Sequence, residues 1–157
     1  MILLHTNDIH GRITGLTRIA TLIEQTRLEH PNETVLYFDT GDSEDLTERM
    51  SNLSKGASMH RLLSAMGCDA VVVGNASLQR FGPEILAEHA AAASYPMLLA
   101  NVRQPHGAPF AGTQPTTLLE ADGHYLGLIG ITSPVDGSYE SFYDLTVSPL
   151  LPTILDM

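Results

Sequence analysis

The sequence predicts an α/β fold whose main sheet is parallel. Four short apolar runs within the first hundred residues alternate with segments of helical periodicity, in the order βαβαβαβ. Strands connected through helices in this way form parallel sheets with right-handed crossovers. The next two apolar runs flank Asp122-Gly123, the strongest short signal for a β-hairpin. The length of 157 residues and the hydrophobic content of 43% suit one globular domain with a sizeable core.

The first two predicted strands flank an amphipathic helix. The apolar run Ile2–His5 is bounded by polar residues and predicts a strand. Apolar residues recur at helical spacing over residues 16–29, and Pro31 stops this helix because the residue before a proline leaves the helical region. The run Val35–Phe38 predicts a second, buried strand, and residues 40–54 follow it as a polar stretch.

The same alternation continues through the next four elements. Residues 56–66 carry apolar side chains at helical spacing, and Gly67 closes that helix. Asp69–Val73 is rich in β-branched residues and predicts the third strand. Pro83–Ala93 predicts a helix because proline is favoured in a first turn, and Pro96–Ala100 predicts the fourth strand.

A hairpin and a loop are expected in the last third of the chain. Thr116–Ala121 and His124–Ile131 are predicted to be the two strands of the hairpin. Residues 132–157 include three prolines and predict a loop. No segment has the composition of a linker, so we expect residues 1–157 to be a single portion of one domain, with no second domain.

The charge balance limits the classes of partner. The chain has 8 basic and 18 acidic residues, a net charge of −10, and no Lys or Arg after Arg103. Such a surface repels phosphate backbones, so we expect no nucleic-acid partner. We expect no membrane partner either, because no apolar run approaches the ~20 residues that cross a bilayer. If the substrate is itself an anion, a bound metal is the usual means of attracting it.

The cysteine content and the N-terminus bear on the compartment. Cys68 is the only cysteine, which excludes an intrachain disulfide and a cysteine-rich zinc site. The N-terminus lacks the basic start, long apolar stretch and cleavage site of a signal peptide. We therefore expect a cytoplasmic location, or a periplasmic or extracellular one if a leader has been removed.

Polar side chains follow each of the four predicted parallel strands. Asp8 and His10 come after the first strand, Asp42 after the second, Asn75 after the third and Asn101 after the fourth. Ligands of open α/β sheets bind beyond the carboxyl ends of the strands, so these groups are expected to converge. The spacing of Asp8 and His10 puts both side chains on one side of an extended backbone. Carboxylate and imidazole suit zinc, manganese or iron, although turn chemistry explains each motif taken alone.

Three of these motifs resemble those of a known enzyme family. Residues 5–11, His-Thr-Asn-Asp-Ile-His-Gly, resemble the opening motif of the 5′-nucleotidase family within the calcineurin-like metallophosphoesterases. Residues 38–42, Phe-Asp-Thr-Gly-Asp, resemble its second motif, and Gly74-Asn75 resembles the start of its third. Residues 98–102 and 127–132 are also similar to the family, so the resemblance runs in order from residue 2 to about residue 134.

This resemblance implies both a fold and a chemistry. The implied fold is a metallophosphoesterase-type α/β/β/α sandwich, and the implied activity is metal-dependent hydrolysis of nucleotide phosphomonoesters, cyclic phosphodiesters or other phosphoesters. It implies two divalent ions (Mn, Zn, Fe or Mg), which generate a hydroxide and clamp the attacking and leaving oxygens. Asp8, His10 and Asp42 would hold the first metal, with Asp42 bridging to the second. Asn75 would bind the second metal and the substrate phosphate.

The third motif departs from the family pattern at two positions. The family has a histidine directly after the asparagine, which stabilises the transition state or protonates the leaving group, and an aspartate three residues later that orients this histidine. Here these positions are Ala76 and Gln79, which neither donate nor relay a proton. The catalytic residues are therefore unknown, and a loss of about 10²–10⁴-fold in rate is expected.

The downstream ligands of the family pattern are a second departure. About three further histidines are expected beyond the hairpin, and none follows His124. We therefore expect at most one ion to bind well, an incomplete sandwich, and a chain that corresponds to the N-terminal portion of the catalytic domain. Exposed apolar residues near the C-terminus then predict contact with a missing C-terminal segment or self-association.

Other residues and functions are expected to be secondary. His60 and His89 lie within predicted helices and are expected to face solvent. The acidic residues at 44, 45 and 48 suit a helix N-terminus or outer support for the metals. A non-catalytic metal-binding, nucleotide-binding or interaction module of the same ancestry is the alternative function, favoured by Ala76 and Gln79. An anion-binding domain without metal is a third, opposed by the crowding of carboxylates.

Overall fold

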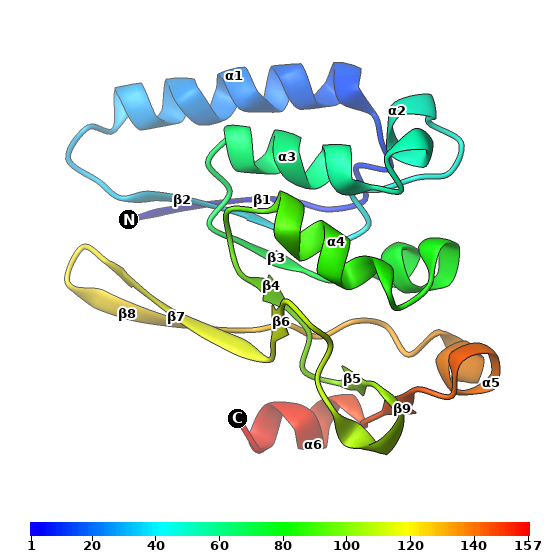
Figure 1. Cartoon of the computed structure of the whole chain (residues 1–157). Helices are drawn as coiled ribbons and strands as arrows, with labels where there is room; N and C mark the ends of the chain where they lie inside the picture. Colours follow the sequence, from blue (N-terminus) through cyan, green and yellow to red (C-terminus); the bar gives the residue numbers. More distant parts are fainter.

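A parallel sheet of five strands forms the centre of the molecule. The computed structural model describes residues 1–157, and the strand order in this sheet is β1-β2-β3-β4-β6, with every neighbouring pair parallel. Helices α1, α3 and α4 lie along one face of the sheet (Figure 1). The strands are β1 (Ile2–Thr6), β2 (Val35–Asp39), β3 (Ala70–Val72), β4 (Met97–Leu98), β5 (Val102–Arg103), β6 (Thr113–Gln114), β7 (Thr116–Ala121), β8 (His124–Ile129) and β9 (Thr146–Val147).

The helices differ widely in length. The α-helices are α1 (Ile13–Glu29), α2 (Arg49–Leu53), α3 (Ala57–Ala65), α4 (Ile85–Ala92), α5 (Ser138–Tyr143) and α6 (Leu150–Leu155). A π-helical turn spans Ser77–Phe81, and short 3₁₀ turns span Pro105–Gly107 and Val135–Gly137. None of these helices combines the length and the apolar character that a membrane crossing requires.

One hydrophobic core joins the sheet to its helices. Its 19 buried residues include side chains from α1, α3 and α4 and from the strands, among them Tyr37, Met59, Leu63 and Leu86. In α1 the buried side chains are Leu16 and Ile23, seven positions apart, which is the spacing of one helix face. The periodicity that predicts this helix therefore also identifies the face that packs on the sheet.

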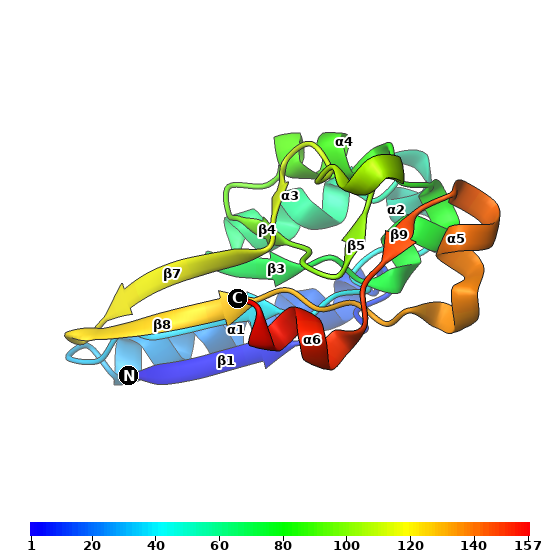
Figure 2. The same ribbon diagram turned by 90° about the horizontal axis from the view of Figure 1, so that it is seen from below.

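The hairpin β7–β8 lies against the other face of the sheet (Figure 2). At its tip, the carboxylate of Asp122 accepts hydrogen bonds from the backbone and hydroxyl of Thr34 and lies 2.8 Å from the Met1 ammonium group. At its base, the Gly130 carbonyl accepts a hydrogen bond from Ala100 N. A cavity of about 240 Å³ separates the hairpin from the strands between these two attachments, and Phe38 is among its lining residues.

The predicted fold class is confirmed, and one expectation about local structure is wrong. The α/β order, the parallel sheet and the hairpin are present, with strand and helix ends within a few residues of their predicted positions. Residues 132–157 are not a loop, because they contain α5, β9 and α6, whereas α2 begins directly after Glu48, where the acidic residues suit a helix N-terminus. These elements have two to six residues, so their own propensity is weak and tertiary contacts decide them. Tyr139 of α5 is fully buried, and β9 pairs with β5.

A close contact at Gly130 leads to the first prediction. A Cβ atom at Gly130 would collide with the backbone and Cβ of Leu98, whereas one at Gly127 in β8 would meet no atom within 4 Å. Overpacking of this kind costs about 1–3 kcal/mol. Gly130→Ala is expected to lower the free energy of unfolding in urea by that amount, and Gly127→Ala to change it by less than about 0.5 kcal/mol. Equal effects of the two substitutions would contradict the close packing.

Asp39, at the end of β2, leads to a pH prediction. Burial raises the pKa of this carboxyl to about 6, although hydrogen bonds from Thr6 Oγ1 and Gly41 N act in the opposite direction. The folded protein therefore binds the proton more tightly than the unfolded chain, and stability is lost as pH rises from about 4 to about 6. The difference between a pKa of about 6 and the ordinary value near 4 corresponds to roughly 3 kcal/mol. Asp39→Asn is expected to remove this loss in urea unfolding at pH 4 and pH 7, and the exposed Asp156→Asn to retain it.

Candidate metal centre

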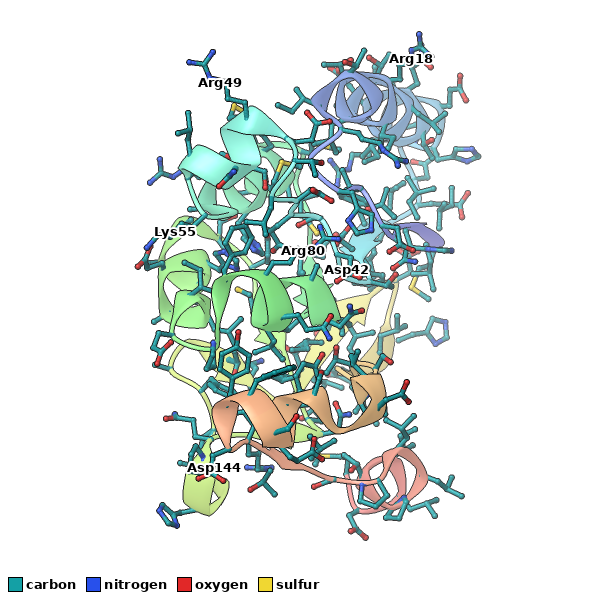
Figure 3. The ribbon with its side chains drawn as sticks, turned by 90° about the vertical axis from the view of Figure 1, so that its right-hand side faces the viewer. Arg18, Asp42, Arg49, Lys55, Arg80 and Asp144 are labelled. Atoms are coloured by element: carbon teal, nitrogen blue, oxygen red, sulfur yellow. The ribbon has the colours of Figure 1, made fainter.

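Three side chains converge where β1 and β2 end. Asp8 and His10 follow β1, Asp42 follows β2, and one ligand atom from each of the three lies within 4.8 Å of the others. The parallel register pairs Thr6 with Asp39, so the segments after both strands leave the sheet at one edge. Figure 3 looks onto this edge, where Asp42 lies near the centre of the view.

Backbone hydrogen bonds continue between the two segments after the strands themselves end. Asp8 N donates to Gly41 O at 3.1 Å, His10 N donates to Asp42 O at 3.0 Å, and Gly11 N donates to Ser43 O at 2.8 Å. These three hydrogen bonds hold the segment that carries Asp8 and His10 against the segment that carries Asp42. The convergence of the three side chains is therefore built into the main chain.

The backbone at all three residues lies in the left-handed region. The φ angles are 55° at Asp8, 48° at His10 and 58° at Asp42. The expectation of an extended backbone between Asp8 and His10 is therefore wrong, although the two side chains do lie together. Non-glycine residues in this region cost free energy and often mark functional sites. Aspartate tolerates it better than most residues because its short side chain bonds locally.

Two glycines allow Asp42 to reach its position. Gly41 has φ 109°, and a Cβ atom there would lie 2.8 Å from the Cα of Gly74. A Cβ atom on Gly74 would collide with Asp42 itself. Asp42 Oδ1 accepts a hydrogen bond of 2.7 Å from Ala76 N, while burial raises the pKa of Asp42. One carboxylate oxygen is thus fixed by the backbone, and the other remains available.

His10 is held between two carboxylates. Its Nδ1 lies 3.3 Å from Asp45 Oδ2, and its Nε2 lies 3.2 Å from Asp8 Oδ1. Asp45 pairs with Arg80 and accepts hydrogen bonds from the backbone N–H and hydroxyl of Thr47; the Thr47 bonds and Arg80 lower its pKa despite burial. Arg80 Nη1, which can only donate, also lies 3.4 Å from His10 Nδ1, so this nitrogen faces a donor and a carboxylate at once.

This donor set suits a divalent cation. Two carboxylates and one imidazole are ligands that zinc, manganese and iron accept. Without a cation, the carboxylates of Asp8 and Asp42 lie close together, and Asp8 contributes to raising the pKa of Asp42. A positive ion would offset this repulsion. The contact between His10 Nδ1 and Asp45 is the kind that orients metal-ligating histidines.

Asn75 and Gln79 form a chain of amides beside this group. Asn75 directly follows Gly74, and its Nδ2 donates to Gln79 Oε1 at 3.2 Å. Gln79 Nε2 donates in turn to Ser138 Oγ of α5 at 3.1 Å. Ala76, between them in sequence, is buried and brings only its backbone N–H to the group, through its bond to Asp42. The Oδ1 atom of Asn75 thus remains free while its amide nitrogen is oriented.

Two expectations about the site residues fail. Asn101 is fully buried, and its amide bonds the backbone of Thr132 at 2.8 and 3.0 Å, so it fastens the chain after β8 rather than joining the cluster. His60 and His89 do not face solvent, since both are buried beside Glu44. Helical periodicity does not identify them because each turns a polar ring toward the core.

Asp45 and Arg80 are the residues that sequence reasoning identified least well. The sequence offers two interpretations of the acidic residues at 44, 45 and 48, and the contact of Asp45 with His10 agrees with outer support for a metal. Arg80 carries no signal in the sequence, because it reaches Asp45 from the π-helical turn 35 residues later. It lies beside Asp42 in Figure 3.

Comparison with known proteins finds 5′-nucleotidases and metallophosphoesterases. The chain is 30% identical over 149 residues to a 5′-nucleotidase of Diplobatis ommata, covering 83% of this chain and 25% of that protein. It is 28% identical over 155 residues to the uncharacterized metallophosphoesterase YunD of Bacillus subtilis, covering 97% and 33%. The chain matches no protein-family model. The chain spans about a quarter to a third of the length of these two relatives.

Solved structures share the fold. The NAD nucleotidase of Haemophilus influenzae superposes with a TM-score of 0.80 at 19% identity, covering 97% of this chain and 30% of that one. The 5′-nucleotidase precursor of Thermus thermophilus gives 0.78 at 20% identity, covering 98% and 33%. The calcineurin-like phosphoesterase YfkN of Bacillus subtilis gives 0.76 at 19% identity, covering 98% and 55%. The chain is thus a homologue of the 5′-nucleotidases and metallophosphoesterases, which are hydrolases, and it has the calcineurin-like phosphoesterase fold.

Proposed function

We propose that this chain is a metal-dependent phosphoester hydrolase domain in which Asp8, His10 and Asp42 hold one divalent ion. The observation that supports it best is the approach of three ligand atoms to within 4.8 Å at one sheet edge. Structural hydrogen bonding alone explains the group poorly, because two carboxylates share one site and Asp8 contributes to raising the pKa of Asp42. The names of the sequence relatives favour a nucleotide or a similar phosphoester as the substrate.

Each residue has a proposed role in this chemistry. Asp8 and Asp42 supply carboxylate oxygens, and His10 supplies the Nε2 atom that faces Asp8, while Asp45 lies beside its Nδ1. Asn75 positions the phosphate, and Gln79 orients the Asn75 amide. A bound divalent ion supplies a Lewis acid and lowers the pKa of its water. Its charge also offsets the net charge of −10 that would repel an anionic substrate.

A slower reaction is part of this proposal. Ala76 brings no proton donor to the centre, and the side chain of Gln79 is engaged by Asn75 and Ser138. General acid catalysis contributes about 10²–10⁴-fold, so turnover is expected to be lower by that factor than with a positioned donor. The same observation favours the second candidate, a metal-binding or nucleotide-binding module without catalysis. Metal bound without turnover would distinguish this module from the enzyme.

Substituting a candidate ligand tests the function directly. Asp8→Asn removes one negative ligand while keeping a side chain that tolerates the left-handed backbone. Bound Mn²⁺, measured by equilibrium dialysis with elemental analysis, is expected to fall from about one equivalent to near zero. Hydrolysis of p-nitrophenyl phosphate and of a nucleoside monophosphate in Mn²⁺ is expected to fall at least about tenfold, since the metal's contribution is lost.

Asp144 provides the matched control for this substitution. It also has φ 55°, it is exposed, and it lies well away from Asp42 in Figure 3. Asp144→Asn therefore reproduces the change of charge and backbone type without touching the centre, and it is expected to leave binding and turnover unchanged. Equal metal content in both variants would exclude Asp8 as a ligand and remove the basis of the proposal.

Asp45 tests whether His10 needs a charged partner beside its Nδ1. Asp45→Asn removes the charge that faces His10 Nδ1, and losing such a partner typically weakens metal affinity about 10–100-fold. The dissociation constant for Mn²⁺ is expected to rise by this factor. The neighbouring exposed Glu48, changed to Gln, is expected to leave it unchanged. Unaltered affinity in a folded Asp45→Asn protein would show that the contact has no role in metal binding.

A further inference from the structure

A second cluster of metal-ligating side chains lies inside the molecule. Glu44 comes from the segment after β2, His60 from α3 and His89 from α4, and each is at most 2% exposed. One ligand atom from each residue lies within 4.8 Å of the other two. The two imidazole rings are 4.4 Å apart between centroids. None of the three belongs to the Asp8–His10–Asp42 group, although Glu44 lies two residues after Asp42.

The hydrogen bonds of His89 leave one of its nitrogens free. Its Nε2 lies 2.6 Å from the carbonyl oxygen of Lys55, and a carbonyl only accepts, so Nε2 carries a proton. Its Nδ1 is buried without a hydrogen-bond partner and lies 3.6 Å from Glu44 Oε1. Burial lowers the pKa of His89, which favours the neutral ring. A lone pair on Nδ1 therefore points toward a carboxylate.

His60 has the complementary arrangement. Its Nε2 lies 2.7 Å from Glu44 Oε1, and its Nδ1 lies 2.9 Å from the hydroxyl of Tyr95. The same hydroxyl is 3.4 Å from the carbonyl oxygen of His60 and can donate its proton there. Tyr95 then accepts from Nδ1, and the proton that Nε2 shares with Glu44 Oε1 is the one that a cation would replace. Histidines that ligate metals commonly donate their other N–H to such an oxygen, and here both rings do.

Glu44 completes the set with an oxygen that has no partner. Its Oε2 atom is buried and accepts no hydrogen bond. Its other oxygen, Oε1, lies 2.7 Å from His60 Nε2 and 3.6 Å from His89 Nδ1. The carboxyl group thus has one oxygen between the two rings and one free oxygen in the interior. A buried polar oxygen without a partner is costly, so a cation that engages it would be stabilising.

We propose that Glu44, His60 and His89 form a second, buried binding site for a divalent cation of the zinc type. Two imidazole nitrogens and one carboxylate give the three protein ligands of an open tetrahedral zinc site. Tetrahedral ligands at 2.0–2.1 Å from zinc are about 3.4 Å apart. The His89 Nδ1–Glu44 distance of 3.6 Å is close to this value, and the His60–Glu44 distance of 2.7 Å must lengthen by roughly 0.7 Å.

The surrounding chain is shaped around this cluster. Gly56 has φ 88°, and a Cβ atom there would lie 2.6 Å from Glu44 Cγ and 2.7 Å from His89 Nε2. Only glycine therefore allows the backbone after Lys55 to pass this close. A proton shared between His89 and Glu44 would satisfy Nδ1 but leave Oε2 unpartnered, whereas a cation can engage both groups. This difference favours the cation over the proton.

Zinc binding in a protein without the first centre tests the proposal. Asp8→Asn/His10→Gln removes two ligands of the exposed group, and zinc is supplied both during expression and in equilibrium dialysis because the cluster is buried. This double variant is expected to retain about one equivalent of Zn²⁺. Adding His89→Gln is expected to weaken zinc binding at least 100-fold, while adding His124→Gln on the exposed start of β8 leaves it unchanged. Far-UV circular dichroism monitors folding in each variant.

A direct measurement avoids reliance on the His89 variant. In ¹⁵N spectra of the imidazole rings of the double variant, Zn²⁺ is expected to shift one Nδ1 atom, that of His89, and one Nε2 atom, that of His60. The proposal is overturned if the double variant binds no zinc, if zinc survives His89→Gln in a folded protein, or if the shifted rings are exposed ones. If His89 Nδ1 keeps a proton in excess zinc, a proton shared between His89 and Glu44 holds this group together, and the proposed cation does not.

Discussion

The extension of strand-like pairing beyond β1 and β2 is the constraint on which the candidate metal centre depends. Main-chain hydrogen bonds from Asp8, His10 and Gly11 to the segment 41–43 hold the two loops together. Gly41 and Gly74 then bring a third segment so close that neither accepts a side chain. The donor atoms consequently converge through main-chain geometry, with Asp45 and Arg80 adjusting only the last group, His10.

Much of this arrangement follows from the sequence, for a clear physical reason. Apolar runs alternating with helical periodicity specify a parallel sheet, and a parallel sheet places Asp8, His10 and Asp42 at one edge. The same rule misplaces Asn101, because β4 has only two residues and the chain turns there to bond Thr132. Periodicity also misses His60 and His89, since it treats an imidazole on a helix as polar and exposed. Their burial depends on Glu44 and Tyr95, which are remote in sequence and become neighbours only in the folded chain.

The segment 42–45 supplies both clusters with carboxylates. Asp42 and Asp45 face the exposed group, while Glu44 between them turns inward to the two histidines. A shift of this segment would therefore alter both environments at once. Its position is set from both sides, by Ala76 N on Asp42 and by Ser51 Oγ, which accepts from Asp45 N at 2.8 Å. These anchors tie α2 and the turn after β3 to the same few residues.

The hairpin is attached to the remaining structure in a different way. Its tip is held by Asp122 and its base by Gly130, with a cavity of about 240 Å³ between the two attachments. Apolar surfaces separated by a gap lose much of their dispersion attraction, so the middle of the hairpin contributes little cohesion. Regions with few packed contacts open at lower free energy than the whole molecule unfolds. Local opening of the hairpin would therefore expose more of the sheet beneath it, including the half-buried Phe38, to any apolar surface nearby.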